Sequence, residues 1–164
     1  DLQGGGEAAT LEPLHEHLFE YKTHMMQNYG AGVQACYRGP RLYDTPETQA
    51  AVTEVIQWYK KYRDILNSDM IHLRRPDARD WDGFIHVNPH KKEKGLAMFF
   101  NPTHQEITRT IHIPLYYTGL TQTARIREKE QKPVTYKLNR NYTVELTVKI
   151  PANGYTWYVV EAAD

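Results

Sequence analysis

The sequence predicts an α+β fold, in which a helical N-terminal segment is followed by a C-terminal antiparallel β-sandwich. Two observations lead to this prediction. Up to about residue 67, apolar residues recur at the spacing of amphipathic helices. After residue 69, apolar and polar residues alternate in short runs separated by Gly, Pro and Asn, which is typical of antiparallel strands. We therefore expect two domains, a helical segment over 1–69 and a sandwich over 70–164.

Two helices are predicted in the first segment. The first begins at Thr10 and ends near Gly30, and its apolar side chains form one stripe, which comprises Leu14, Leu18, Tyr21 and Met25. The second begins after Thr45, whose hydroxyl suits the N-cap, with Pro46 at its first position. The apolar stripe of this second helix comprises Val52, Val55, Ile56, Tyr59, Tyr62 and Leu66. Residues 30–37 are predicted to form a buried strand or a tight crossing.

Several short strands are predicted in the second segment. Each is a run rich in β-branched and aromatic residues, and turn residues separate it from the next run. The runs cover residues 83–88, 95–101, 106–113, 123–128, 134–138, 142–150 and 155–162. Residues 69–82 contain a proline and several aspartates, so we expect a polar connection there rather than a strand.

One of these runs, at residues 96–100, shows no alternation because every position is apolar. Such a run is typical of a strand buried on both faces. We expect one face to enter the core between the sheets and the helices to cover the other. The first face would carry Leu96, Met98 and Phe100, and the second Ala97 and Phe99. Pro102 lacks an N–H and ends the strand, and residues 101–106 are predicted to form a hairpin turn to the next strand.

Composition excludes several classes of protein. The formal net charge is zero, which gives no electrostatic basis for non-specific nucleic-acid binding. A mean hydropathy of -0.69 and the lack of a long apolar run predict no membrane span. The single cysteine, Cys36, allows no internal disulfide. Residues 1–10 lack the pattern of a signal peptide and an initiator Met, so we expect a piece of a longer polypeptide.

The order of these segments resembles the C-terminal end of bacterial α-galactosidase-like glycoside hydrolases, which have a (β/α)8 barrel. The stretches that carry the resemblance are "WYKKYRDILNSD" and "KEKGLAMFFNPTHQEITRTIHIPL", and it covers roughly residues 29–161. It implies that 29–44 is the last barrel strand with its loop and that Thr45–Asn67 is the last barrel helix. It also implies that the two catalytic carboxylates lie on earlier barrel strands, so we do not expect this chain alone to hydrolyse glycosides.

The predicted function follows from this resemblance. We expect a non-catalytic C-terminal region that packs against and supports the catalytic (β/α)8 barrel of the same polypeptide. An oligo- or polysaccharide is a further candidate partner, and a periplasmic or secreted location is implied only if the resemblance holds. The alternatives are a carbohydrate-binding module and a stand-alone enzyme. Uncovered apolar surface on the first helix would favour the supporting role, and an exposed aromatic row the binding module.

Six residues are candidates for ligand binding, namely Tyr37, Arg38, Arg41, Asp44, Trp81 and Trp157. The first four surround a tight Gly-Pro turn, where an arginine fork can hold sugar hydroxyls or a carboxylate. The other interpretation of that loop is an Arg–Asp pair that only fixes its shape. The two tryptophans offer rings that can stack on a sugar, although Trp81 can equally plug the junction between the halves.

A larger aromatic set is a candidate carbohydrate-binding face, and it comprises Tyr116, Tyr117, Tyr155, Trp157 and Tyr158. Alternation along the last strand places Tyr155 and Trp157 on one face and Tyr158 on the other. At least one of these two sets therefore belongs to the core.

No metal site and no cofactor are predicted. A histidine-rich face of the first helix lacks the His-Glu-x-x-His spacing of zinc proteases, and its members are His17, Glu20 and His24. The carboxylates of Asp77, Asp80 and Asp82 can in principle bind Ca²⁺, but they lack the spacing of an EF-hand loop. We favour a solvated helix face in the first case and an interdomain connection in the second.

Overall fold

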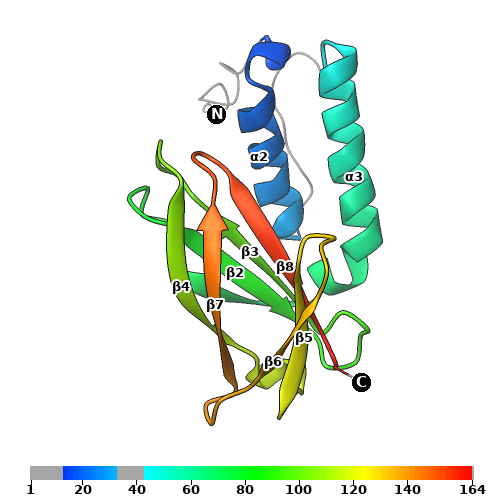
Figure 1. Ribbon diagram of the computed structural model, residues 1–164. Coiled ribbons are helices and arrows are strands. Elements are labelled where there is room, and N and C mark those ends of the chain that lie inside the picture. The colour runs from blue at the N-terminus through cyan, green and yellow to red at the C-terminus, as the bar shows by residue number, and fades with distance from the viewer. Residues whose placement is uncertain (1–12, 33–42, 164) are drawn as a thin grey trace. The chain divides into compact units, whose positions relative to one another are not determined.

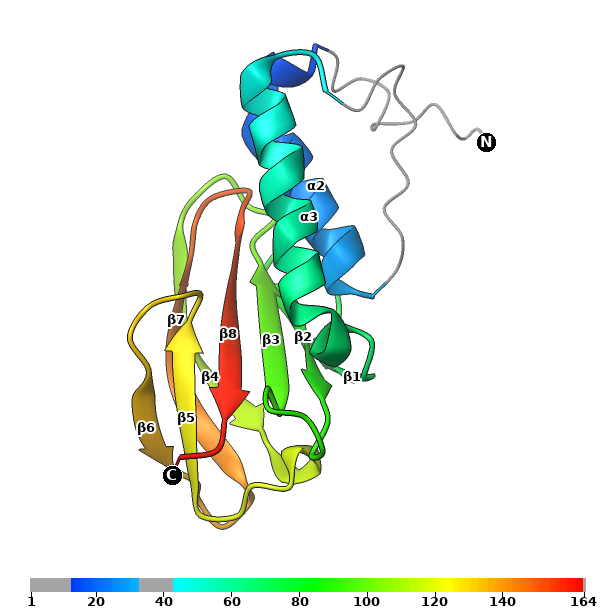
Figure 2. The ribbon, with the colours of Figure 1, turned by 90° about the vertical axis from the view of Figure 1, so that its right-hand side faces the viewer.

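The computed structural model describes residues 13–32 and 43–163 of the 164-residue chain (Figures 1 and 2). The chain divides into two compact units, and the division falls between Leu66 and Asn67. Helices and antiparallel sheets are both present, so the predicted α+β class with a β-sandwich is confirmed. Within the described residues, no helix combines the length and apolar character that a membrane span requires.

The first unit contains a short 3-10 helix and two α-helices that lie side by side (Figure 1). Their bounds are η1 (Leu14–Glu16), α2 (Leu18–Gly30) and α3 (Pro46–Leu66). The rings of Tyr29 and Tyr59 join the two α-helices with their centroids 5.1 Å apart. The predicted stripes are largely buried, and the buried members are Leu14, Tyr21, Met25, Val52, Val55, Tyr62 and Leu66.

The helix starts differ in how well they were predicted. α3 begins after Thr45 as expected, and the Thr45 hydroxyl accepts the backbone N–H of Thr48 at 3.3 Å. The first helix is interrupted at His17, where φ is -126° and ψ is 33°, so η1 and α2 replace one continuous helix. Thr10, the predicted cap, lies outside the described residues, and so do residues 33–37 of the predicted strand or crossing.

The second unit is an antiparallel sandwich of eight strands. The strands are β1 (Asp69–Arg74), β2 (Asp82–Val87), β3 (Gly95–Phe100), β4 (Ile107–Pro114), β5 (Thr123–Glu128), β6 (Val134–Lys137), β7 (Thr143–Ile150) and β8 (Tyr155–Glu161). One sheet has the order β1-β2-β3-β8-β5-β6, and the other pairs β4 with β7. A 3-10 turn, η2 (Tyr116–Thr118), lies between β4 and β5. Each predicted strand is present within a residue or two of its expected bounds.

Strand β1 was missed, because residues 69–74 were expected to belong to a polar connection. Among the strands that the structure describes, β1 is an edge strand that pairs only with β2. Its residues are exposed or half-buried, and its apolar alternation is limited to Ile71 and Leu73, which pack against the core. Such a short alternation, followed by a proline and several aspartates, did not mark the segment as a strand.

The core between the sheets contains the opposite face of β3 from the one predicted. Ala97 and Phe99 belong to it, and the Phe99 ring meets the Tyr158 ring at 5.8 Å between centroids. Leu96, Met98 and Phe100 are buried on the other face, opposite three residues of β8, which are Val159, Trp157 and Tyr155. A run that is apolar at every position does not reveal which alternate residues point inward, and the register with β2 and β8 decides it.

Residues 101–106 do not form a hairpin turn. β3 and β4 belong to different sheets, so this segment crosses from one sheet to the other. Residues 151–154 make the reverse crossing, from β7 to β8. The two crossings lie together at one end of the sandwich, where the backbone N–H of Asn101 donates to Gly154 at 2.9 Å and that of Asn153 to Thr103 at 2.9 Å.

Candidate functional site

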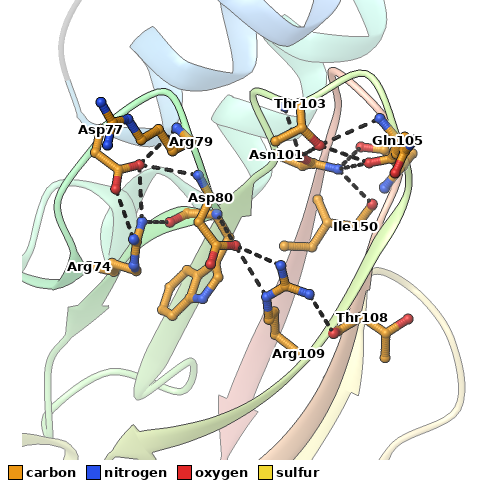
Figure 3. Close-up of polar contacts among 12 residues, drawn as sticks. Arg74, Asp77, Arg79, Asp80, Asn101, Thr103, Gln105, Thr108, Arg109 and Ile150 are labelled. Carbon is orange, nitrogen blue, oxygen red and sulfur yellow. Dashed lines mark hydrogen bonds and ion pairs between the residues drawn. The ribbon is translucent and has the colours of Figure 1, made fainter.

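Two polar clusters lie at the end of the sandwich where the two crossings meet, and Figure 3 shows them side by side. The first is centred on Asn101, whose side chain is buried. Its amide donates to the carbonyl of Ile150 at 3.2 Å, of Pro151 at 3.1 Å and of Gln105 at 2.8 Å. Its carbonyl oxygen accepts the N–H of Thr103 at 2.9 Å and the Thr103 hydroxyl at 2.7 Å. The Asn-Pro-Thr stretch thus joins both crossings between the sheets.

The second cluster lies in the loop between β1 and β2. The Arg74 guanidinium donates to both carboxylate oxygens of Asp77, at 2.9 and 3.3 Å, and to the carbonyl of Trp81 at 2.6 Å. Asp77 also accepts the backbone N–H of Arg79 at 2.9 Å. The Arg74 hydrogen bond, followed by that from Arg79, holds the pKa of Asp77 well below its usual range. Asp77 is therefore an ionised group that fixes the loop.

Asp80 connects this loop to the two-stranded sheet. Its carboxylate accepts the N–H of Trp81 at 2.7 Å and the Nε of Arg109, on β4, at 3.1 Å. The Trp81 hydrogen bond is the main cause that lowers the pKa of Asp80, and burial opposes it. Since protein donors occupy both oxygens of Asp77 and Oδ1 of Asp80, these two groups are engaged in fixing the loop. No group of three side chains suited to a metal ion lies together among the described residues.

Asp82 differs from its neighbours. Burial raises the pKa of its carboxyl to about 6, the charge of Arg74 opposes this shift, and the charge of Asp77 adds to it. It lies at the start of β2, opposite Phe100. A carboxyl with a raised pKa is a feature of many acid–base sites, and it also occurs at structural positions where a strand end is buried.

Trp81 packs over the edge of the core. Its ring lies edge-on to Phe99 at 5.8 Å between centroids, and the Arg74 guanidinium lies 5.9 Å from its ring centroid. A Cβ at Gly83 would lie 3.4 Å from the Trp81 ring, which is an ordinary contact distance. The ring is half-buried, and its role in ligand binding stays a prediction.

Asp44 is the one member of the predicted loop site that the structure describes; Tyr37, Arg38 and Arg41 lie outside the described residues. Its carboxylate accepts the His15 ring Nδ1 at 2.9 Å, the His15 backbone N–H at 3.1 Å and the Thr48 hydroxyl at 3.0 Å. Burial of the carboxylate raises its pKa, but the bonds from His15 and Thr48 outweigh this and lower the pKa to about 2. Asp44 therefore joins η1 to the start of α3.

The aromatic residues of β8 are buried. Trp157 is 6% exposed, and Tyr155 and Tyr158 are buried on the two faces of the strand. Trp157 could stack on a sugar only if its neighbours moved. Its role in ligand binding stays a prediction. The exposed tyrosines of the second unit, among the described residues, are Tyr116 and Tyr117 of η2 and Tyr142, which precedes β7.

Comparison with known proteins places the fold among glycoside hydrolases. No family model matches the chain, and no curated protein matches its sequence. Solved structures match it at the level of fold. A GH27 β-L-arabinopyranosidase from Geobacillus stearothermophilus aligns with a TM-score of 0.54 and 12% identity, over 89% of this chain and 31% of its own.

Two further structures give the same result. The α-galactosidase I of Mortierella vinacea aligns with a TM-score of 0.54 and 14% identity, over 87% of this chain and 35% of its own. An α-amylase from Geobacillus thermoleovorans aligns with a TM-score of 0.56 and 12% identity, over 88% of this chain and 33% of its own. The chain has the fold of part of a glycoside hydrolase. It spans about a third of each matched chain, and the predicted resemblance is confirmed at the level of fold.

Proposed function

We propose that this chain is the non-catalytic C-terminal region of a carbohydrate-active glycoside hydrolase and that it packs against and supports a catalytic barrel of the same polypeptide. The observation that carries the proposal is the coverage of the structural matches. Almost the whole chain aligns with glycoside hydrolases, yet it corresponds to about a third of their length. The barrel, with the carboxylates that cleave the glycosidic bond, would belong to the remainder of the polypeptide.

The polar groups of the sandwich support a structural role. Asp77 and Asp80 are paired with arginines, and Asn101 joins the two crossings between the sheets. Such contacts fix loops and leave few free lone pairs for a reacting substrate. The first unit would supply the last helix of the barrel, in keeping with the capped start and apolar stripe of α3.

One expected sign of a missing barrel is weaker than predicted. Leu14, Tyr21 and Met25 are buried, so the stripe of the first helix does not present uncovered apolar surface. The exposed large apolar side chain of α2 is Phe19, which lies outside that stripe. Phe19 is therefore the position of α2 at which contact with a barrel would be sought first.

The size of the natural gene product tests the proposal directly. An antibody raised against this chain should detect, in the source cells, a polypeptide several times larger than 19.2 kDa. The longer protein should hydrolyse a nitrophenyl glycoside, such as the α-galactoside, while the 164-residue chain should not. A product of 19.2 kDa, or hydrolysis by the short chain, would overturn the proposal.

The supporting role has its own test in the longer protein. Replacement of Asn101 by Ala should lower the melting temperature of that protein and leave its kcat unchanged below the transition, because the sandwich would stabilise the barrel without touching substrate. The matched control is Gln105→Ala, which alters an exposed side chain of the same crossing and keeps the backbone carbonyl that Asn101 contacts. Equal melting temperatures for the two variants would argue against a sandwich that supports the barrel.

A further inference from the structure

Three tyrosine side chains form an exposed cluster on the second unit. Tyr116 is the central member; its ring centroid lies 5.1 Å from that of Tyr117 and 5.4 Å from that of Tyr142. Both ring pairs are nearly perpendicular, at 83° and 79°. Tyr116 and Tyr117 are 62% and 63% exposed, and Tyr142 is 36% exposed. We name these three residues the tyrosine cluster.

The backbone brings the cluster together from two separate segments. The N–H of Leu115, just before η2, donates to the carbonyl of Tyr142 at 2.8 Å. Figure 2 shows η2 and the turn between β6 and β7 at the same end of the sandwich. Thr118 closes η2, because its backbone N–H and its hydroxyl both donate to the carbonyl of Leu115. The rings are therefore presented on fixed backbone.

Tyr142 adopts a conformation that few bulky residues adopt. Its φ is 59°, in the left-handed region that favours Gly, Asn and Asp. Asn139 maintains this turn: its side-chain oxygen accepts the N–H of Asn141 at 2.9 Å and of Thr143 at 3.1 Å, and its carbonyl accepts the N–H of Tyr142 at 3.0 Å. Backbone strain that the surrounding structure maintains is concentrated at functional positions. The strain here places an aromatic ring against Tyr116.

The chemistry of the surroundings identifies a ligand class. Segments 114–120 and 138–143 contain the three tyrosines together with two exposed asparagines, Asn139 and Asn141, and one charged residue, Arg140, whereas Thr118 is buried. A saccharide has apolar C–H faces that stack on aromatic rings and hydroxyls that pair with phenol, amide and hydroxyl groups. We propose that the tyrosine cluster is a binding site for a neutral saccharide chain, separate from any catalytic barrel.

Other partners fit this surface less well. A nucleic acid would require several Lys or Arg side chains to neutralise phosphates, and the two segments supply only Arg140. The exposed rings present roughly 300 Å² in all, while a stable protein interface needs about 800 Å² on each partner. One or two sugar rings that stack on Tyr116 and its neighbours would match this smaller area.

Affinity electrophoresis of the 164-residue protein tests the proposal. Native gels containing galactomannan, soluble starch or dextran should retard the parent protein in at least one case. Tyr116→Ala should weaken binding about tenfold, because it removes the central ring, while Tyr116→Phe should keep most of the retardation. Tyr43→Ala is the matched control, since it removes an exposed tyrosine of the first unit and should change nothing.

A second variant separates binding from folding. Tyr142→Asn removes a ring and relaxes the strained turn, so it should lose affinity while its melting temperature rises or stays the same. Lack of retardation in all three gels would overturn the proposal. Retardation of Tyr116→Ala and Tyr142→Asn equal to that of the parent protein would overturn it as well. A parent dimer in sedimentation that Tyr116→Ala converts to monomer would also overturn it and assign the cluster to self-association. These outcomes do not depend on the proposed barrel, which is tested by the size of the gene product.

Discussion

The side-chain amide of Asn101 donates a hydrogen bond to the carbonyl of Ile150 at 3.2 Å and so connects the end of β3 in one sheet to the end of β7 in the other. The two residues are far apart in the chain, and each lies where a strand gives way to a crossing between sheets. Because the amide is buried and also serves Pro151 and Gln105, one side chain satisfies the backbone at both crossings.

Replacement of Asn101 by Ala should therefore destabilise the second unit. The variant leaves buried carbonyls without their donor, which costs about 2–4 kcal/mol when more than one is affected. Urea unfolding followed by tryptophan fluorescence measures the change, and Asn141→Ala, at an exposed position, is the control. If Asn101→Ala lost less unfolding free energy than the control, water would have replaced the amide at this end of the sandwich.

Replacement of Gly83 by Ala should also destabilise the sandwich. A Cβ at Gly83 would lie 2.5 Å from the carbonyl oxygen of Met98, and this backbone atom belongs to the neighbouring strand. Relief of such a clash costs roughly 1–3 kcal/mol, because β2 and β3 must separate and the Phe99 ring, which the Cβ would meet at 3.1 Å, must shift. Gly95→Ala is the comparison, since its Cβ would meet only side-chain atoms, at 3.3 Å. We expect Gly95→Ala to lose less unfolding free energy than Gly83→Ala in the same assay.

The raised pKa of Asp82 predicts a pH dependence of stability. Its carboxyl has a pKa of about 6 in the folded protein and an ordinary value of 3.8, so between these values the folded state binds more protons than the unfolded state. Stability therefore falls as pH rises from about 4 to 6, by about 1 kcal/mol once solvent screening is allowed for. Asp82→Asn should lack this component when unfolding midpoints at pH 4.5 and 7 are compared. Identical pH profiles for the two proteins would assign the titration elsewhere.

The His15–Asp44 pair is expected to contribute less to the stability of the first unit at both high and low pH. The hydrogen bond to Asp44 raises the pKa of His15 above 6.5, so this contribution is complete below that value and is lost as pH rises through the raised pKa. The pKa of Asp44 is lowered to about 2, so its contribution is present above about 4 and is lost as pH falls towards 2. The pair therefore stabilises the first unit most between pH 4 and 6.5.

An NMR titration of the His15 ring measures this coupling. Asp44→Asn should return the pKa of His15 towards 6.5, while Glu47→Gln, which removes the smallest of the contributing charges, should change it little. A His15 pKa that is the same in the parent and in Asp44→Asn would contradict the hydrogen bond between them.

Much of the secondary structure was predictable because local physics determines it. The capped start of α3 at Thr45 and the alternation of β7 follow from side-chain hydrogen bonding and from burial of one strand face. Strand β1 was not predictable, since an edge strand with exposed residues needs little apolar surface. The glycoside hydrolase resemblance came from the order of these elements, and the structural matches confirm it at the level of fold.

The candidate sites were predicted only in part. Asp44 was singled out, but its partner is His15, a residue distant in sequence whose position depends on the packing of η1 against α3. Tyr116 and Tyr117 were identified as aromatic candidates, while Tyr142 was included only as the first residue of the predicted strand 142–150. Its positive φ turns it out of that strand and towards Tyr116.

By itself, the sequence determined the fold class, every described strand except β1, and the polar Asn-Pro-Thr stop after Phe100, because these depend on residues that are neighbours along the chain. The tertiary structure alone decided that Phe99 rather than Phe100 enters the core, that residues 101–106 cross between sheets, and that Tyr142 meets the distant Tyr116. The physical reason is that strand pairing sets register and face, and pairing joins residues whose separation in sequence leaves no local signal.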